Sequence, residues 1–115
     1  AKMSGAYSTL SMERTRRNLS RSADHLHWHP GYLPQTLDAD APTDVAWLHI
    51  DLNSAAATVA VLEFFWNRLT ADAIVVFDDY GWTYFDDTRR AVDGFLANRR
   101  GALLPLPTGQ ALYFC

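Results

Sequence analysis

Apolar runs and amphipathic stretches alternate along most of the chain. Residues 45–50 (VAWLHI) and 73–77 (AIVVF) are nearly continuous apolar runs of strand length, which is typical of strands that are covered on both faces. Between them, residues 55–69 keep apolar side chains at helical spacing, and Asn53 or Ser54 can cap that helix. The pattern therefore predicts a strand, a helix and a second strand in this order.

The residues after the second strand predict a further helix and a closing hairpin. Asp86 or Asp87 can cap a helix with one apolar side, and Gly101 follows the basic end of that helix. Residues 102–106 (ALLPL) and 111–114 (ALYF) flank the turn signal Pro-Thr-Gly, which favours an antiparallel hairpin. Because strands that alternate with helices pair in parallel through right-handed crossovers, we expect an α/β fold with a mostly parallel sheet and a C-terminal antiparallel hairpin.

The N-terminal part of the chain predicts a helix and one more strand. Residues 8–21 hold helix-tolerant residues with sparse apolar positions, and residues 25–29 (HLHWH) alternate in the manner of a strand. Alternate histidines on a strand can chelate zinc, but no fourth ligand is evident, so we interpret them as a polar strand face. These histidines are His25, His27 and His29.

Composition indicates a globular protein. Of the 115 residues, 49% are hydrophobic and 20% are charged, and the formal net charge of −3 gives no electrostatic footprint for nucleic acid. We interpret the arginines between residues 14 and 21 as a solvated helix face. The single cysteine, Cys115, excludes an internal disulfide, and no segment has the pattern of a signal peptide or a membrane span. We therefore expect a cytoplasmic protein with no nucleic-acid or membrane partner.

Acidic residues follow both apolar strands. Asp51 comes directly after residues 45–50, and Asp78 and Asp79 come directly after residues 73–77. If the two strands are neighbours, the three carboxylates meet at the sheet edge where open α/β sheets bind ligands. A divalent cation would relieve their repulsion, and oxygen ligands suit Mg²⁺ better than zinc. Acidic residues also cap helices and form turns, so the spacing alone leaves both interpretations open.

Other common motifs are absent from the sequence. The six glycines form no G-x-G or phosphate-cradling loop, and no G-x-S-x-G nucleophile elbow occurs. Three aromatic residues follow the acidic pair, and they either form a stacking wall for a sugar or aromatic ring or pack in the core. They are Trp82, Tyr84 and Phe85.

Five segments carry a resemblance to a known family. The segments, in chain order, are HPGYLPQTL, WLHIDLNSAAATVAVLEFFWNRL, AIVVFDDYGW, AVDGFLANRRG and LPTGQALYF. Together they resemble the C-terminal half of the macrocin O-methyltransferase family, and the resemblance runs from Ser11 to Phe114. The most specific parts are HIDLN, FDDYGW and LPTGQ. Members are class I enzymes that use S-adenosylmethionine and a divalent metal, often on sugars of natural products. The resemblance implies a Rossmann-like methyltransferase sheet of strand order 3-2-1-4-5-7-6, of which residues 1–115 form a single partial domain.

The resemblance also implies roles for residues. Asp51, Asp78 and Asp79 correspond to the metal ligands, here for Mg²⁺, and Asp51 corresponds to the catalytic base as well. The implied reaction is methylation of a hydroxyl group on a small-molecule substrate, with the metal lowering the pKa of that hydroxyl. The first two strands of the class, which carry the glycine-rich loop, have no counterpart here. We therefore expect a C-terminal piece of an enzyme that by itself binds S-adenosylmethionine poorly and is inactive, and we assign no cofactor-binding residue.

Two other interpretations remain. Without the missing strands, residues 45–50 would expose an unpaired strand edge, which a second chain can cover. The alternative function is therefore a non-catalytic methyltransferase remnant that acts as a dimerising or interaction module in a homo-oligomer. A phosphoryl-transfer or receiver-like domain also gathers aspartates at strand ends, but this interpretation is disfavoured because Lys2 is the only lysine.

Overall fold

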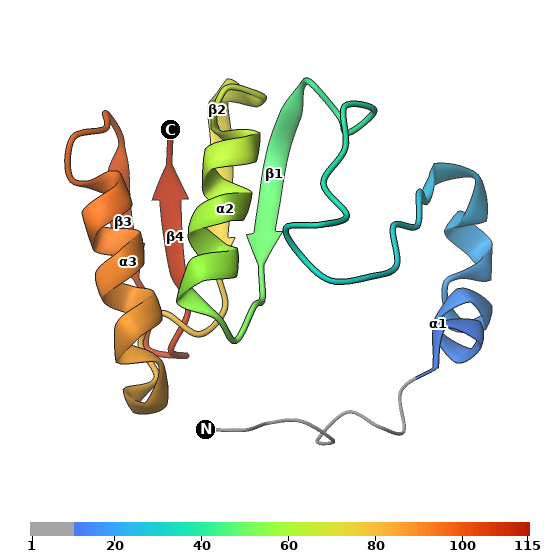
Figure 1. Cartoon of the computed structure of the whole chain (residues 1–115), viewed down its shortest axis with the longest axis horizontal. Coiled ribbons are helices and arrows are strands. Elements are labelled where there is room, and N and C mark those ends of the chain that lie inside the picture. The colour runs from blue at the N-terminus through green and yellow to red at the C-terminus, as the bar shows by residue number, and fades with distance from the viewer. Residues whose placement is uncertain (1–10) are drawn as a thin grey trace. The chain divides into compact units, whose positions relative to one another are not determined.

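The computed structural model describes residues 11–115. The chain is divided into two compact units, and the boundary along the sequence lies between Pro30 and Gly31. The first unit contains α1 (Met12–Asn18) and the 3₁₀ helix η1 (Ser20–His25) (Figure 1). The Ser11 hydroxyl accepts a hydrogen bond from the backbone N–H of Arg14 at 3.1 Å and so caps α1. The described helix α1 is therefore shorter than the helix predicted over residues 8–21, of which residues 8–10 lie outside the described residues. The arginines of this segment are exposed, as the interpretation of a solvated face requires.

The strand predicted over residues 25–29 is wrong. His25 ends η1, and the residues after it form no strand. The Trp28 ring instead lies 5.6 Å from the guanidinium carbon of Arg16, within the same unit. A strand needs a hydrogen-bonded neighbour, and the four strands found in residues 11–115 all belong to the second unit. Alternation of side chains alone does not supply that neighbour.

The second unit is a four-stranded sheet with two helices. Its strands are β1 (Val45–Ile50), β2 (Leu69–Phe77), β3 (Ala102–Pro105) and β4 (Ala111–Phe114). Their order in the sheet is β1-β2-β4-β3, in which β1 and β2 are parallel and the pairs β2–β4 and β3–β4 are antiparallel. This order corresponds to the 4-5-7-6 part of the expected methyltransferase sheet and includes the predicted C-terminal hairpin. The α/β fold is confirmed, but with no histidine strand the described sheet is mixed rather than mostly parallel. The helical elements of this unit are α2 (Ala55–Trp66), the 3₁₀ turn η2 (Thr83–Phe85) and α3 (Asp86–Leu96).

The N-terminal cap predicted from the sequence is confirmed for α2 and is wrong for α3. Ser54 caps α2, because its hydroxyl accepts the backbone N–H of Ala57 at 3.3 Å. The predicted cap of α3 is wrong, because the N-cap residue is Phe85 and its side chain makes no capping hydrogen bond. Asp86 and Asp87 lie inside the first turn, where their negative charges interact favourably with the helix dipole. The helix also ends at Leu96, before the predicted basic end.

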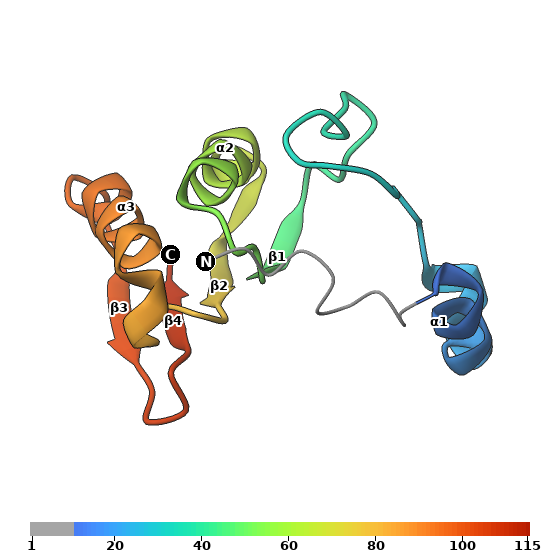
Figure 2. The same ribbon diagram turned by 60° about the horizontal axis from the view of Figure 1, so that its bottom comes forward.

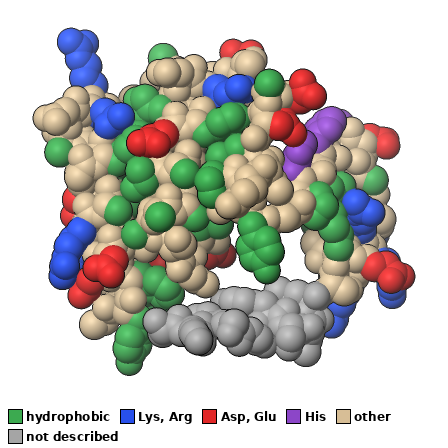
Figure 3. All heavy atoms as spheres, viewed as in Figure 1, with side chains coloured by type: hydrophobic (Ala, Val, Ile, Leu, Met, Phe, Trp, Pro, Cys, Tyr) green, Lys and Arg blue, Asp and Glu red, His purple; other side chains and the backbone are tan. Residues whose placement is uncertain are grey.

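Both α-helices of this unit lie side by side on one face of the sheet (Figures 1 and 2). Their apolar sides meet alternate residues of the strands, with Leu62 of α2, Val75 of β2 and Val92 of α3 fully buried. On the side viewed in Figure 3, acidic and basic side chains are interspersed. No helix within residues 11–115 is long and apolar enough to cross a membrane. The packed layer fixes the ends of β1 and β2, where the acidic residues lie.

Candidate metal centre

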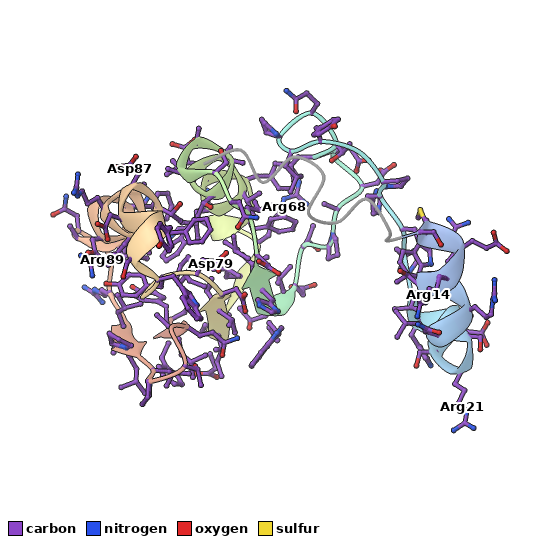
Figure 4. The ribbon with its side chains drawn as sticks, turned by 90° about the horizontal axis from the view of Figure 1, so that it is seen from below. Arg14, Arg21, Arg68, Asp79, Asp87 and Arg89 are labelled. Atoms are coloured by element: carbon purple, nitrogen blue, oxygen red, sulfur yellow. The ribbon has the colours of Figure 1, made fainter. Side chains whose placement is uncertain are left out.

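Three carboxylates meet at the carboxyl ends of β1 and β2. Ile50 and Phe77 are register partners, so Asp51 and Asp78 are the first residues beyond two aligned strand ends. Each of Asp51, Asp78 and Asp79 offers a carboxylate oxygen, and these oxygens lie within 4.8 Å of one another. Figure 4 looks onto this edge of the sheet and labels Asp79 there. The predicted convergence of the three side chains is therefore confirmed, whereas their binding of a metal stays a prediction.

The group is electrostatically strained without a cation. Burial, followed by the charges of Asp51 and Asp78, raises the pKa of Asp79 above its ordinary value of 3.8. Asp51 is exposed, while Asp78 and Asp79 are half-buried. A cation would offset the mutual repulsion, and the all-oxygen donor set suits a hard ion such as Mg²⁺. The residues present thus fit the metal that the family resemblance implies.

Asp78 has two further neighbours, one in β1 and one directly before β4. Its Oδ1 accepts a hydrogen bond from Nε2 of Gln110 at 2.8 Å, and Nε2 of His49 lies 3.5 Å from the same oxygen. The His49 side chain is half-exposed on β1. Sequence reasoning missed Gln110: the motif LPTGQ was visible, but the motif does not say which residue its glutamine contacts.

The loop after β2 is held from two sides. The Tyr80 hydroxyl donates a hydrogen bond of 2.6 Å to Oδ1 of Asp93 on α3, and burial together with this bond raises the pKa of Tyr80 to about 12. On the other side, the backbone N–H of Gly81 donates to the carbonyl of Gly109 in the β3–β4 turn at 2.7 Å. Helix and hairpin therefore both restrain the residues that follow the acidic pair.

Two glycines permit this close approach. A Cβ on Gly81 would lie 3.2 Å from the Cα of Gly109, which is tighter than ordinary contact. Gly109 has a φ of +89°, and the indole ring of Trp82 occupies the space where its Cβ would be. The glycines in FDDYGW and LPTGQ thus serve one backbone contact between the two motifs.

A small cavity lies beneath the loop, and Trp82, Tyr84 and Phe85 do not line it. The cavity, lined in part by Thr58, Asp79 and Tyr80, has a volume of about 10 Å³, which is about the space of one water molecule. The hydroxyl of Thr58 is buried with no hydrogen-bond partner among residues 11–115. Trp82 and Tyr84 are 55% and 88% exposed, which excludes the core-packing interpretation for these two rings.

Comparison with known proteins identifies the family. A family model described as a methyltransferase domain matches residues 4–80, which is more than half of the chain and includes all three aspartates. The chain belongs to this methyltransferase domain family. The class I methyltransferase resemblance is thereby confirmed, while macrocin-like specificity stays a prediction. A search of curated proteins found no match.

Among solved structures, the O-methyltransferase NovP is similar to this methyltransferase-family chain. The match has a TM-score of 0.76 at 23% sequence identity and covers 91% of this chain. It covers 45% of the NovP chain, so the present chain spans less than half of that structure's length. At this identity the likeness is evidence of fold, and it confirms that the β1-β2-β4-β3 sheet is part of a methyltransferase fold.

Proposed function

We propose that the chain carries the metal-binding part of an O-methyltransferase that uses S-adenosylmethionine and a divalent metal on a hydroxyl group of a small molecule. The observation that carries the proposal is the convergence of Asp51, Asp78 and Asp79 at the ends of adjacent parallel strands in a methyltransferase family member. The name of the similar structure, an O-methyltransferase, supports oxygen as the acceptor atom.

The three aspartates would hold Mg²⁺. Bound there, the metal would lower the pKa of a substrate hydroxyl and orient its oxygen. The transfer forms an O–CH₃ bond, breaks the S–CH₃ bond of S-adenosylmethionine, and requires the hydroxyl to lose its proton. Asp51, which the family resemblance implies as the catalytic base, is the proposed acceptor of that proton, and it is the most exposed of the three carboxylates.

The acceptor side of the site is proposed to lie by the aromatic residues after the acidic pair. The exposed rings of Trp82 and Tyr84 can stack on a flat or sugar-like substrate, since such rings combine apolar faces with a polar group. A sugar hydroxyl, as found in natural products, is therefore the proposed substrate class.

The test is metal-dependent binding of an acceptor. Catechols and sugars with adjacent hydroxyl groups are titrated into the chain with Mg²⁺, with a chelator, and into an Asp78→Ala variant. We expect binding with Mg²⁺ and its loss under both other conditions. Any transfer of a labelled methyl group from S-adenosylmethionine must be lost under the same two conditions. Binding or transfer that is indifferent to chelator and variant would contradict the metal role.

A second candidate function is the interaction module. β1 is an edge strand, and its Trp47 is 59% exposed. Trp47, Ile74 and Phe114 are successive register partners and form an apolar row on the sheet face that α2 and α3 leave uncovered. An open edge beside an apolar row favours pairing with a second copy. Light scattering tests this: a homo-oligomer that Trp47→Glu dissociates supports it, and a monomer contradicts it.

A further inference from the structure

We propose that Gln110 is a positioning residue of the metal centre, and that the motif LPTGQ exists to deliver its side-chain amide to Asp78. This inference rests on the proposed metal site and deepens it. The Gln110 amide Nε2 donates to Oδ1 of Asp78 at 2.8 Å, although the two residues are 32 positions apart in the sequence. The bond would fix the rotation of one ligand carboxylate.

Strand register brings the two residues together. Phe77 of β2 pairs with Ala111 of β4 in the antiparallel ladder, so the next pair beyond the strand ends joins Asp78 and Gln110. The turn that precedes Gln110 is closed by two backbone bonds, from Leu106 N–H to the Gln110 carbonyl at 2.8 Å and from Gly109 N–H to the Leu106 carbonyl at 3.1 Å. Backbone hydrogen bonds alone therefore place Gln110 opposite Asp78.

A second side chain orients the amide. The Thr108 hydroxyl donates to Oε1 of Gln110 at 3.3 Å, so the amide oxygen faces Thr108 and the amide NH₂ faces Asp78. Gln110 is half-buried, whereas Thr108 is exposed. The chain of contacts runs from the hydroxyl through the amide to the carboxylate, with each donor matched to an acceptor.

An amide suits this position chemically. Three carboxylates already repel one another here, and a neutral donor stabilises one of them without adding a cation that would compete with a metal. Hydrogen-bond partners of metal ligands typically change metal affinity by about 10- to 100-fold when they are removed. The same range is expected for Gln110.

The experiment measures Mn²⁺ affinity by electron paramagnetic resonance for the whole chain and three variants. Gln110→Met keeps the length of the side chain but cannot donate, and we expect its Kd to rise by about 10- to 100-fold. Thr108→Val, which loses the hydroxyl, should show a smaller rise, and Thr108→Ser, which keeps it, should bind as the parent does. In NMR spectra, the side-chain NH₂ resonances of Gln110 should shift when Mg²⁺ is added. Circular dichroism with chelator present checks that each variant folds.

The outcomes separate this inference from the proposed function. If the parent chain does not bind Mn²⁺, the metal site fails and the positioning role fails with it. If the parent binds, Asp78→Asn/Asp79→Asn does not, and folded Gln110→Met binds as tightly as the parent, the metal site stands and the role of Gln110 is overturned. Should Gln110→Met not fold, the Thr108 pair decides, because equal affinities of Thr108→Val and Thr108→Ser would overturn the hydrogen-bond chain.

Discussion

The backbone N–H of Asp78 donates a hydrogen bond of 3.0 Å to the carbonyl of Ile50, one position beyond the last residue of β2. The ladder between β1 and β2 therefore continues up to the candidate metal centre. Because the backbone rather than the carboxylates sets this position, substitution of an aspartate side chain should change the charge of the site while the strand ends stay paired.

The first prediction concerns Asp79 and pH. The pKa of the Asp79 carboxyl group is raised, so that without metal the folded chain binds the proton of this group more tightly than the unfolded chain does. The resulting stability is present at low pH and is lost as the pH rises from the ordinary value of 3.8 through the raised folded value. Asp79→Asn should remove this loss and raise the Tm at neutral pH. Thermal denaturation with chelator, from acid to neutral pH, measures it.

Asp87→Asn is the control for that series. The Asp87 side chain is 91% exposed and lies 3.8 Å from Arg90. Its substitution removes only a small favourable interaction with the helix dipole and should leave the loss of stability with rising pH in place. Parallel pH profiles for the parent and Asp79→Asn would contradict the expected repulsion among the three carboxylates.

Tyr80→Phe should destabilise the chain by about 1 kcal/mol, because it removes the hydrogen bond to Asp93. The pKa of Tyr80 is about 12, so the bond contributes fully below pH 10.0 and is lost as the pH rises through about 12. Urea unfolding at neutral pH gives the difference. Tyr84→Phe, at a side chain that is 88% exposed, is the matched control and should have no effect. Equal effects of the two substitutions would rule out the proposed link between the loop and α3.

Gly109→Ala should destabilise the chain by about 1–3 kcal/mol, since a φ of +89° is unfavourable for alanine and the new Cβ would collide with Trp82. Gly94→Ala in α3 should do the opposite and stabilise by about 0.5–1 kcal/mol, because nothing lies within 4 Å of its Cβ position. Denaturant unfolding of both variants measures the contrast. A neutral Gly109→Ala would mean that the turn adopts another conformation.

The strands next to the site could be predicted from the sequence because their patterns are strong. Residues 45–50 and 73–77 are nearly continuous apolar runs, and the structure buries Val75, Val76 and Phe77 almost completely. The expected coverage of both faces is wrong for residues 45–50, of which only Ile50 is buried, because β1 is an edge strand. Acidic residues directly after such runs must lie at strand ends. Convergence of the carboxylates then needed only that β1 and β2 be neighbours, which they are.

The incorrect and missing predictions have a common cause. Residues 25–29 alternate as a strand does, but alternation says nothing about a hydrogen-bonding neighbour, and the structure has none for them among residues 11–115. The contact of Gln110 with Asp78 depends on the register of β4 against β2, which local patterns do not encode. Both features are set by long-range pairing rather than by neighbouring residues.

The most direct measurement is calorimetric titration of Mg²⁺ into the chain and into Asp78→Asn/Asp79→Asn. The matched control is Asp86→Asn/Asp87→Asn, which removes the same charge from the neighbouring acidic pair in the first turn of α3. We expect a single Mg²⁺ site in the parent and in the control, and none in the Asp78/Asp79 variant. Equal binding by all three chains, or no binding by the parent, would contradict a metal centre at the ends of β1 and β2.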